Sequence, residues 1–375
     1  MEKKIVTTHS WMNVEGIEKI ESPALFFYYD RIIWNIEKMI EIAGKPEFLR
    51  PHVKTHKTEQ IVKLQMVKGI TRFKCSTIAE VEMVAYCGAN DILLAFQPVG
   101  PNIQRLIRLI QKFPNQNISA IVDSEKIIHQ LSANAKEAKI NIRLWLDINN
   151  GMNRTGIQTG NEVVELCRLI QKLPNVELQG LHVYDGNLHE KDLSKRKKLC
   201  DEAFEPVNHL IEKLRQSGIP VQSVVAGGTP GFPIHAKRKS VETSPGTTIL
   251  WDYGYATSFP DLEFLNAALV FTRVISKPGE DLLCFDLGHK AVGDDMPNPR
   301  VYLIGIKKFE VIKHNEEHLT IRTPEAINWN IGDHCFGIPY HICPTVVRYD
   351  SAYVVKDNKI MDKWKITARD RKLTI

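Results

Sequence analysis

Short apolar runs alternate with longer amphipathic segments from about residue 22 onward, and this alternation constrains the fold of the chain more than any other feature. The apolar runs have the length and the β-branched and aromatic residues of strands, while the segments between them have helical spacing. Strands that alternate with helices form parallel sheets. We predict strands at 24–29, 48–54, 72–75, 91–95, 118–122, 142–148, 177–184 and 223–226.

Helical patterns lie between these strands, including those at 36–40, 59–67, 78–86 and 103–111. Eight strands separated by helices over about 200 residues are the pattern of a (β/α)8 barrel of the TIM type. We therefore assign the chain to the α/β class and expect the barrel domain over residues 20–258.

The alternation of strand-like and helix-like segments stops beyond about Ser258. The runs 268–275 and 318–322 alternate apolar and polar residues and are rich in β-branched side chains, without long helices between them. This pattern predicts a smaller, mainly β domain over residues 259–375. We expect residues 1–19, including the segment around Ile5, to complete it.

The composition is ordinary for a globular protein, with 43% hydrophobic residues, 25% charged residues and a formal net charge of +5. The basic run 195–198 lies among other polar residues and is typical of a solvated helix face, so we expect no nucleic-acid partner and no membrane partner. Seven cysteines without CxxC spacing predict no disulfide framework, and no signal-peptide pattern is present at the N-terminus. We expect a reduced, cytoplasmic protein.

A lysine lies at the end of the second predicted strand, in the segment RPHVKTHK at 50–57. His52, Lys54 and His56 share a face if the strand persists that far, and strand ends face the active site of a barrel. Imidazoles and a second cation should disfavour the ammonium form of Lys54, and a neutral amine can form an imine with an aldehyde. A basic loop that touches solvent or phosphate is the alternative interpretation of this segment.

Two other motifs suggest ligands. Gly227-Gly228-Thr229 follows a predicted strand, where glycine allows backbone N–H groups to approach a phosphate, although a tight turn is the commoner explanation of the motif taken alone. His341 and Cys343 share a face on an extended chain and could bind one cation. A buried histidine near a buried cysteine is the alternative.

Several segments resemble the alanine-racemase-like (fold type III) pyridoxal-phosphate enzymes, and most closely the D-threonine aldolase and D-serine dehydratase group. The resemblance begins at SPAL and PHVKTHK and spans nearly the whole chain in the right order. Its further segments are CSTIAEVE (75–82), DINNGMNRTG (147–156), YDG (184–186), GGTP (227–230) and SPGT (244–247).

The resemblance implies pyridoxal 5'-phosphate bound as a Schiff base to Lys54. It also implies that Arg154 donates to the phenolic oxygen of the cofactor and that Tyr184 contacts the ring or the substrate; a surface guanidinium and a packed rim tyrosine are the alternatives. The cofactor-binding residues expected on this basis are Lys54, His52, Arg154, Tyr184, Gly227, Gly228 and Thr229.

The resemblance also implies that His341 and Cys343 hold a divalent metal, because metal-dependent members of the group carry such a pair before Pro-Thr. A thiolate with an imidazole suits Zn²⁺, whereas a carboxylate would suit Mn²⁺ or Mg²⁺ better. The activity implied is that of a lyase on small D-3-hydroxy amino acids. We favour dehydration of D-serine or D-threonine to a 2-oxo acid and ammonia, with Lys54 as the catalytic base.

The alternative reaction is retro-aldol cleavage to glycine and an aldehyde, for which His56 is a candidate base. An amino-acid racemase and a non-catalytic carrier of pyridoxal phosphate are less favoured, because neither needs both the metal pair and a second domain. By analogy with the fold, we expect a homodimer.

Overall fold

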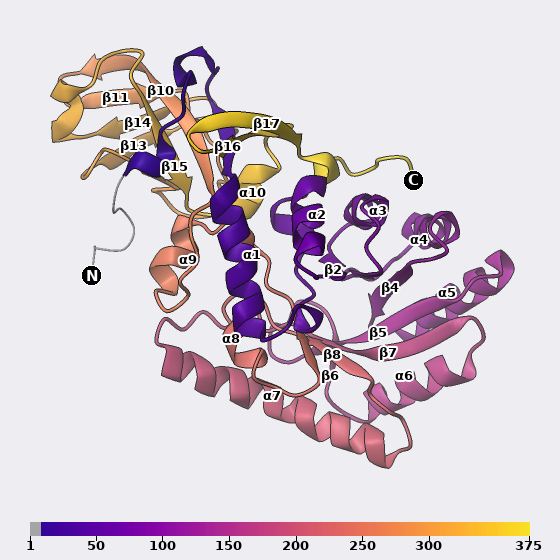
Figure 1. Ribbon diagram of the computed structural model, residues 1–375. Helices are drawn as coiled ribbons and strands as arrows, with labels where there is room; N and C mark the ends of the chain where they lie inside the picture. The colour runs from indigo at the N-terminus through magenta and orange to yellow at the C-terminus, as the bar shows by residue number, and fades with distance from the viewer. Residues whose placement is uncertain (1–8) are drawn as a thin grey trace. The chain divides into compact units, whose positions relative to one another are not determined.

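The computed structural model describes residues 9–375, so the predicted role of the segment around Ile5 lies outside the described residues. The chain divides into two compact units (Figure 1). The barrel unit comprises residues 36–248 and 370–375, and the β unit comprises residues up to 35 together with 249–369. Within the described part of the chain, every helix is too short or too polar to cross a membrane.

The barrel unit contains a parallel sheet with the strand order β2-β3-β4-β5-β7-β8-β9, and the two-residue strand β6 pairs with β5. Neighbouring strands are parallel throughout, as expected for alternating strands and helices. The strands are β2 (Arg72–Cys75), β3 (Asp91–Leu94), β4 (Asn117–Val122), β5 (Ile142–Asn149), β6 (Ile157–Gln158), β7 (Val176–Val183), β8 (Ser223–Ala226) and β9 (Val241–Thr243).

Helices follow most of these strands along the chain (Figure 1). Their apolar faces are buried, and two of them begin at a side chain that caps the first turn: Thr77 accepts a hydrogen bond from the backbone N–H of Glu80, and Asp192 accepts one from that of Lys195. The helices are α2 (Glu59–Val67), α3 (Ile78–Tyr86), α4 (Pro101–Lys112), α5 (Glu125–Ala138), α6 (Asn161–Lys172), α7 (Leu193–Gln216) and α8 (Phe232–His235). Helix α1 (Tyr29–Ala43) begins in the β unit and ends in the barrel unit.

The sheet of the barrel unit closes through an irregular segment, where we predicted the strand 48–54. Leu49 forms an isolated parallel bridge with Thr243 of β9, and His52 forms one with Lys74 of β2. Phe48 ends a 3-10 turn and Val53–Thr55 form another, so the predicted strand is wrong, and only the two isolated bridges stand in its place. Two features prevent a continuous strand: Pro51 has no N–H to donate to a ladder, and the His52 side chain caps the second turn.

The strand predicted at 24–29 does form, as β1 (Ala24–Tyr28), but it lies in the β unit. It pairs antiparallel with β10 and parallel with β16. All five residues are buried, so the sequence has no polar face that would show which sheet the strand joins. The last strand of the barrel sheet is instead β9, whose three residues were too short to be predicted. The α/β barrel class is confirmed with these two corrections.

The β unit contains a nine-stranded mixed sheet with the order β13-β14-β11-β10-β1-β16-β17, in which β15 pairs with β10 and β12. Its aromatic core is built around Phe26, Phe271 and Phe336, whose ring centroids lie 5.3 to 5.8 Å apart. Besides β1, its elements are β10 (Ala268–Gly279), β11 (Leu282–Phe285), β12 (Val301–Leu303), β13 (Glu310–His314), β14 (Leu319–Arg322), β15 (His334–Pro339), β16 (Ser351–Lys356), β17 (Lys359–Lys365), α9 (Tyr253–Ser258) and α10 (Ile342–Val346).

Candidate active site

Lys54 lies on the 3-10 turn that follows the closing segment of the barrel sheet. Its neighbours Val53 and Thr55 are fully buried, while Lys54 itself is partly buried. The backbone N–H of Lys54 donates to Nδ1 of His52 at 3.3 Å, which fixes the turn. Lys54 therefore follows the segment that closes the barrel sheet, at the end of the barrel where the catalytic side chains of such folds occur.

An ion pair anchors the chain just beyond Lys54. The ammonium of Lys57 contacts the carboxylate of Glu80, whose side chain is fully buried at the start of α3. Glu80 also accepts hydrogen bonds from the backbone N–H and the hydroxyl of Ser76. The two sequence segments that carry the resemblance at 51–57 and 75–82 are thus joined in space, and Glu80 is a positioning residue that the sequence analysis missed.

The two histidines near Lys54 differ in their surroundings. His52 is buried, and burial together with the charges of Lys54 and Lys74 holds its pKa well below the ordinary value. His56 is also buried, and its Nδ1 accepts a hydrogen bond from the backbone N–H of Thr58 at 3.1 Å. Burial lowers the pKa of His56 to about 3. Both imidazoles are therefore neutral at pH 7.

A second lysine, Lys74, lies beside Lys54 and was not singled out from the sequence. It belongs to β2, opposite His52 in the bridge that closes the barrel sheet, and its side chain is buried with a relative exposure of 2%. Burial, with the nearby charge of Lys54, lowers the pKa of Lys74 to about 7. The barrel unit thus presents two amines at neighbouring positions.

Two further residues at strand ends form a buried pair. Nδ1 of His182 on β7 lies 2.7 Å from Oδ1 of Asp147 on β5. Burial lowers the pKa of His182, and hydrogen bonds from His182 and Thr155 hold the pKa of Asp147 below its ordinary value although burial opposes this. Oδ2 of Asp147 and Nε2 of His182 are buried polar atoms without a hydrogen-bond partner.

Tyr184 lies just after β7, close to two basic side chains. The guanidinium carbon of Arg154 lies 4.9 Å from the centroid of its ring, and the ammonium nitrogen of Lys74 lies 5.7 Å from it. Arg154 is exposed on a loop in which Oδ1 of Asn149 accepts hydrogen bonds from the N–H groups of Gly151 and Asn153. The structure therefore places the two predicted residues Arg154 and Tyr184 together.

The predicted phosphate loop is held by its own hydrogen bonds. The N–H of Gly227 donates to the carbonyl of Val183 at 3.0 Å, and that of Gly228 donates to Oδ1 of Asp185 at 3.2 Å. Thr229 Oγ1 accepts the N–H groups of Gly246 and Thr247 at 3.2 and 3.3 Å. The donors that converge on one point therefore come from 246–247, a segment that the sequence analysis did not assign to the phosphate.

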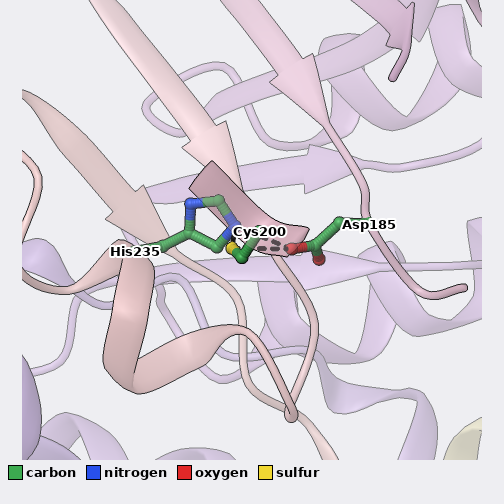
Figure 2. Close-up of side chains that lie close together, drawn as sticks. All are labelled: Asp185, Cys200 and His235. Carbon is green, nitrogen blue, oxygen red and sulfur yellow. Dashed lines mark hydrogen bonds and ion pairs between the residues drawn. The ribbon is translucent and has the colours of Figure 1, made fainter. Parts of the chain in front are cut away.

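Asp185, Cys200 and His235 lie together behind this loop (Figure 2). Oδ2 of Asp185 is 2.8 Å from Nε2 of His235, and the thiol of Cys200 donates to the same oxygen at 3.4 Å. A Cβ atom at Gly227, where φ is +76°, would lie 2.6 Å from Cδ2 of His235. The cluster therefore packs directly under the glycine loop, and only glycine fits above it.

The three ligand atoms of this cluster lie within 4.8 Å of one another, which by distance alone suits a cation. The hydrogen bonds indicate another role. Nε of Arg238 donates to Nδ1 of His235 at 3.2 Å, so the neutral imidazole carries its proton on Nε2 and donates it to Asp185. Burial raises the pKa of Cys200 to about 12 and so disfavours the thiolate. We interpret the cluster as a hydrogen-bond relay from Arg238 to the N–H of Gly228.

The predicted metal pair lies in the β unit at the start of α10. His341 and Cys343 are both partly exposed, and their side chains are hydrogen-bonded to each other. They are brought together by the first turn of a helix and not, as we predicted, by an extended strand. Nδ1 of His341 lies 2.6 Å from Oδ2 of Asp295. This contact leaves Nε2 of His341 as the nitrogen that can meet a cation, the arrangement of a carboxylate–histidine–metal site.

The donors of each site fit the group expected there. Buried unpartnered polar atoms of Asp147, His182 and Ser244 in the barrel unit match the need of a polar cofactor for hydrogen bonds. An imidazole and a thiol, with a carboxylate beside them, are ligands that zinc prefers. The residues present therefore suit pyridoxal phosphate in the barrel unit and zinc in the β unit.

A parallel (β/α) barrel with a lysine after the segment that closes its sheet is typical of a class of cofactor-dependent enzymes. Comparison with known proteins identifies the family. The family model described as the N-terminal domain of alanine racemase matches residues 28–254, more than half of the chain. A second model, described as "Putative serine dehydratase domain", matches residues 267–355. The chain belongs to the alanine racemase N-terminal domain family.

Similar proteins cover nearly the whole chain. D-threonine aldolase from Arthrobacter sp. is 27% identical over 361 residues, which are 95% of this chain and 94% of the relative. D-serine dehydratase from Dictyostelium discoideum is 23% identical over 94% of this chain and 98% of its own length. The crystal structure of D-threonine aldolase from Filomicrobium marinum matches with a TM-score of 0.87 and 25% identity, over 94% of this chain and 96% of that one.

Proposed function

We propose that this protein is a pyridoxal-phosphate- and metal-dependent lyase that acts on small D-3-hydroxy amino acids. The observation that carries the proposal is the chain-long similarity to such lyases, combined with Lys54 on the turn after the segment that closes the barrel sheet, next to the buried Lys74 and His52. A racemase would need no metal pair, and a carrier of the cofactor would need no β unit. Both alternatives therefore leave His341 and Cys343 without a role.

Within this proposal the barrel residues hold the cofactor and move protons. Lys54 would carry the cofactor through its amine and, once released, take the proton from Cα of the substrate. Arg154 and Tyr184 would flank the ring. The hydroxyl of Thr229, whose Oγ1 accepts the N–H groups of Gly246 and Thr247, would donate its proton to the phosphate. When bound, the cofactor supplies an electron sink for the charge that develops at Cα.

The β unit would act on the β-hydroxyl of the substrate. His341 and Cys343 would hold a zinc ion, and Asp295 would orient the imidazole. A bound cation polarises a hydroxyl oxygen and makes it a better leaving group. We therefore favour dehydration, in which Lys54 removes the α-proton, the hydroxyl leaves, and a 2-oxo acid and ammonia are the final products.

Retro-aldol cleavage is the second candidate, because the similarity to D-threonine aldolase extends over 95% of this chain. It needs a base for the β-hydroxyl proton. His56, the base that we proposed, has its Nδ1 engaged by Thr58 and a pKa of about 3, set by burial. A group so hard to protonate is a weak base, and this environment favours the dehydratase.

One incubation separates these reactions. Purified protein is supplied with pyridoxal phosphate and with D-serine, D-threonine or D-threo-3-hydroxyaspartate, with and without a chelator. We expect a 2-oxo acid and ammonia, and loss of product with the chelator. Glycine and an aldehyde would establish the aldolase instead. Turnover that survives the chelator would remove the metal from the proposal, and the absence of any cofactor bound at Lys54 would end it.

We further propose that the enzyme works as a homodimer in the cytoplasm. The fold commonly completes its site between two copies, and all seven cysteines, which lie within the described residues, are outside disulfide bonds, five of them buried, as suits a reducing compartment. Light scattering of the purified protein tests the dimer: a mass of about twice 42.8 kDa supports it, and a mass of one chain contradicts it.

A further inference from the structure

Lys74 is a buried cation for which the structure offers no direct counter-ion. Its side chain has a relative exposure of 2%, and within residues 9–375 its ammonium makes neither a hydrogen bond nor an ion pair within 4 Å. An ammonium group removed from water without a partner is strongly disfavoured. A lysine in such surroundings is therefore expected either to stay uncharged or to pair with an anionic group of a bound ligand.

The nearby carboxylates are engaged elsewhere. Oδ1 of Asp147 pairs with His182, and Asp185 is bound by His235 and by the N–H of Gly228. Both carboxylates attract Lys74 through space, whereas Lys54 and Arg50 repel its charged form. The other ionisable groups that face Lys74 from the packed elements are His52, His182 and Tyr184.

The position of Lys74 points to the reacting end of the site. It is the bridge partner of His52, two residues from Lys54. Tyr184 separates it from the glycine loop, because a Cβ atom at Gly228 would lie 3.0 Å from Cε2 of Tyr184. Lys74 therefore lies in the neighbourhood of the Lys54 amine, whose charge acts on it.

We propose that Lys74 is a second cationic binding residue of this site, which takes up a proton when an oxyanion binds beside the amine of Lys54. The inference deepens the proposed function and rests on it. The oxyanion is the phenolic oxygen of the cofactor or the carboxylate of the D-amino acid. Both carry negative charge close to the carbon that is attached to Lys54, so both offer the missing counter-ion.

Proton uptake follows from the change in surroundings. Burial holds the pKa of unliganded Lys74 at about 7, so at pH 8 most of its amine is neutral. An oxyanion in contact favours the ammonium form and raises this pKa. Ligand binding at pH 8 is then expected to be accompanied by uptake of roughly 0.9 proton per chain at Lys74.

The test measures proton uptake by calorimetry at pH 8, in buffers of different ionisation enthalpy. Wild-type protein is compared with Lys74→Met, which removes the charge at similar volume, with Lys74→Arg, which keeps a permanent charge, and with the surface control Lys63→Met on α2. The ligands are pyridoxal phosphate added to the empty protein and then D-alanine added to the loaded protein; D-alanine lacks the β-hydroxyl that the lyase reaction removes.

We expect wild type and Lys63→Met to take up close to one proton more than Lys74→Met and Lys74→Arg. We also expect Lys74→Met to weaken binding about 10- to 100-fold, while Lys74→Arg retains most of the affinity. Uptake on addition of pyridoxal phosphate assigns the oxyanion to the cofactor, and uptake only with D-alanine assigns it to the substrate. Equal uptake and equal affinity in wild type and Lys74→Met would overturn the inference.

Two further measurements distinguish a failure of the Lys74 inference from a failure of the proposed function and from a loss of stability. Borohydride reduction and peptide mapping should label Lys54 in every variant. A wild type without label on Lys54 contradicts the proposed function itself, and a label on Lys74 overturns only the present inference. Thermal unfolding of the empty protein should show Lys74→Met at least as stable as wild type, because a buried amine without a partner has been removed. A large loss of stability would mark Lys74 as structural and would contradict the inference.

Discussion

In the barrel unit, His182 is buried against Asp147, and in the β unit, His341 lies against Asp295 at a similar distance. Burial lowers the pKa of His182 despite its carboxylate. His341 is partly exposed, and although burial opposes it, hydrogen bonds with Cys343 and Asp295 and the charge of Asp252 raise its pKa to about 9. The same pair of residue types thus has a lowered histidine pKa in one unit and a raised histidine pKa in the other.

The two histidine pKa values differ because the two pairs differ in their exposure to solvent. The barrel site places the partly buried Lys54 beside the buried Lys74 and neutral histidines, and burial lowers the pKa of Lys74. In the β unit, the carboxylate of Asp295 and the thiol of Cys343 lie beside one imidazole in partial contact with solvent, and these groups can bind a metal ion that displaces the proton of the imidazole. The barrel unit is therefore prepared for covalent chemistry, and the β unit for metal chemistry.

The largest expected effect tests whether the two units act independently. Lys54→Ala should abolish covalent retention of the cofactor and reduce turnover by about 10³-fold or more, because the amine that binds and moves protons is lost. Zinc content, measured by atomic absorption, should remain that of wild type. Loss of zinc together with the cofactor would break the comparison by showing that the two sites form as one.

The next effect distinguishes a hydrogen-bond relay from a metal site within the barrel unit. Asp185→Ala should lower the free energy of unfolding by about 3–5 kcal/mol, because a buried His235 and the N–H of Gly228 lose their acceptor. The control Asp201→Ala removes a half-exposed partner of Arg238 and should cost at most about 1 kcal/mol. Urea unfolding measures both. If chelator destabilises wild type as much as Asp185→Ala does, the cluster holds a metal.

A smaller effect sharpens the role assigned to the β unit. Asp295→Asn should weaken zinc binding by about 10- to 100-fold, because the carboxylate that orients His341 is lost while His341 and Cys343 remain. Asp294→Asn changes the adjacent carboxylate, which pairs with Arg348, and serves as the matched control. Competition with a zinc-binding dye gives both affinities. Equal affinities would show that Asp295 does not support the site.

The smallest effect concerns the neutral histidines of the barrel unit. The pKa of His56 is about 3 when folded, below its ordinary value of 6.5, so between these values the unfolded state binds more protons. Its contribution to stability is complete above pH 6.5 and falls with the pH, by about 2 kcal/mol between pH 6.5 and pH 5. Urea unfolding at pH 7 and pH 5 should show a shallower decline for His56→Gln than for the helix-surface control His129→Gln. Identical declines would contradict the burial argument.

The alternation of strands and helices was sufficient to predict the α/β barrel class, because buried parallel strands and amphipathic helices differ in period. It could not place β1 or find β9. A wholly apolar strand has no face that assigns it to a sheet, and three residues are too few to show a period. The irregular closing segment was also beyond prediction, because a proline and a capping histidine, and not hydrophobicity, end it.

Sequence reasoning singled out candidate residues where they follow a strand or a predicted strand, as with Tyr184, the loop at 227–229 and Lys54. The same rule applied to every strand would have found Lys74, Asp147 and His182, which lie near the ends of β2, β5 and β7. Glu80 could not be found in this way, because its role depends on an ion pair across 23 residues. The assignments of cofactor and metal residues remain predictions for the experiments above.

The irregular segment at 49–52 has one more consequence. Three backbone hydrogen bonds, donated by the amides of Arg50, His52 and Lys74, join it to the strands on either side. The segment that closes the barrel sheet therefore lies next to Lys54, the residue whose amine is proposed to bind the cofactor. A ligand that binds both to Lys54 and to the segment 246–247 would stabilise the hydrogen bonds that close the barrel sheet. Deuterium should then enter these three amides more slowly in the loaded enzyme than in the empty one.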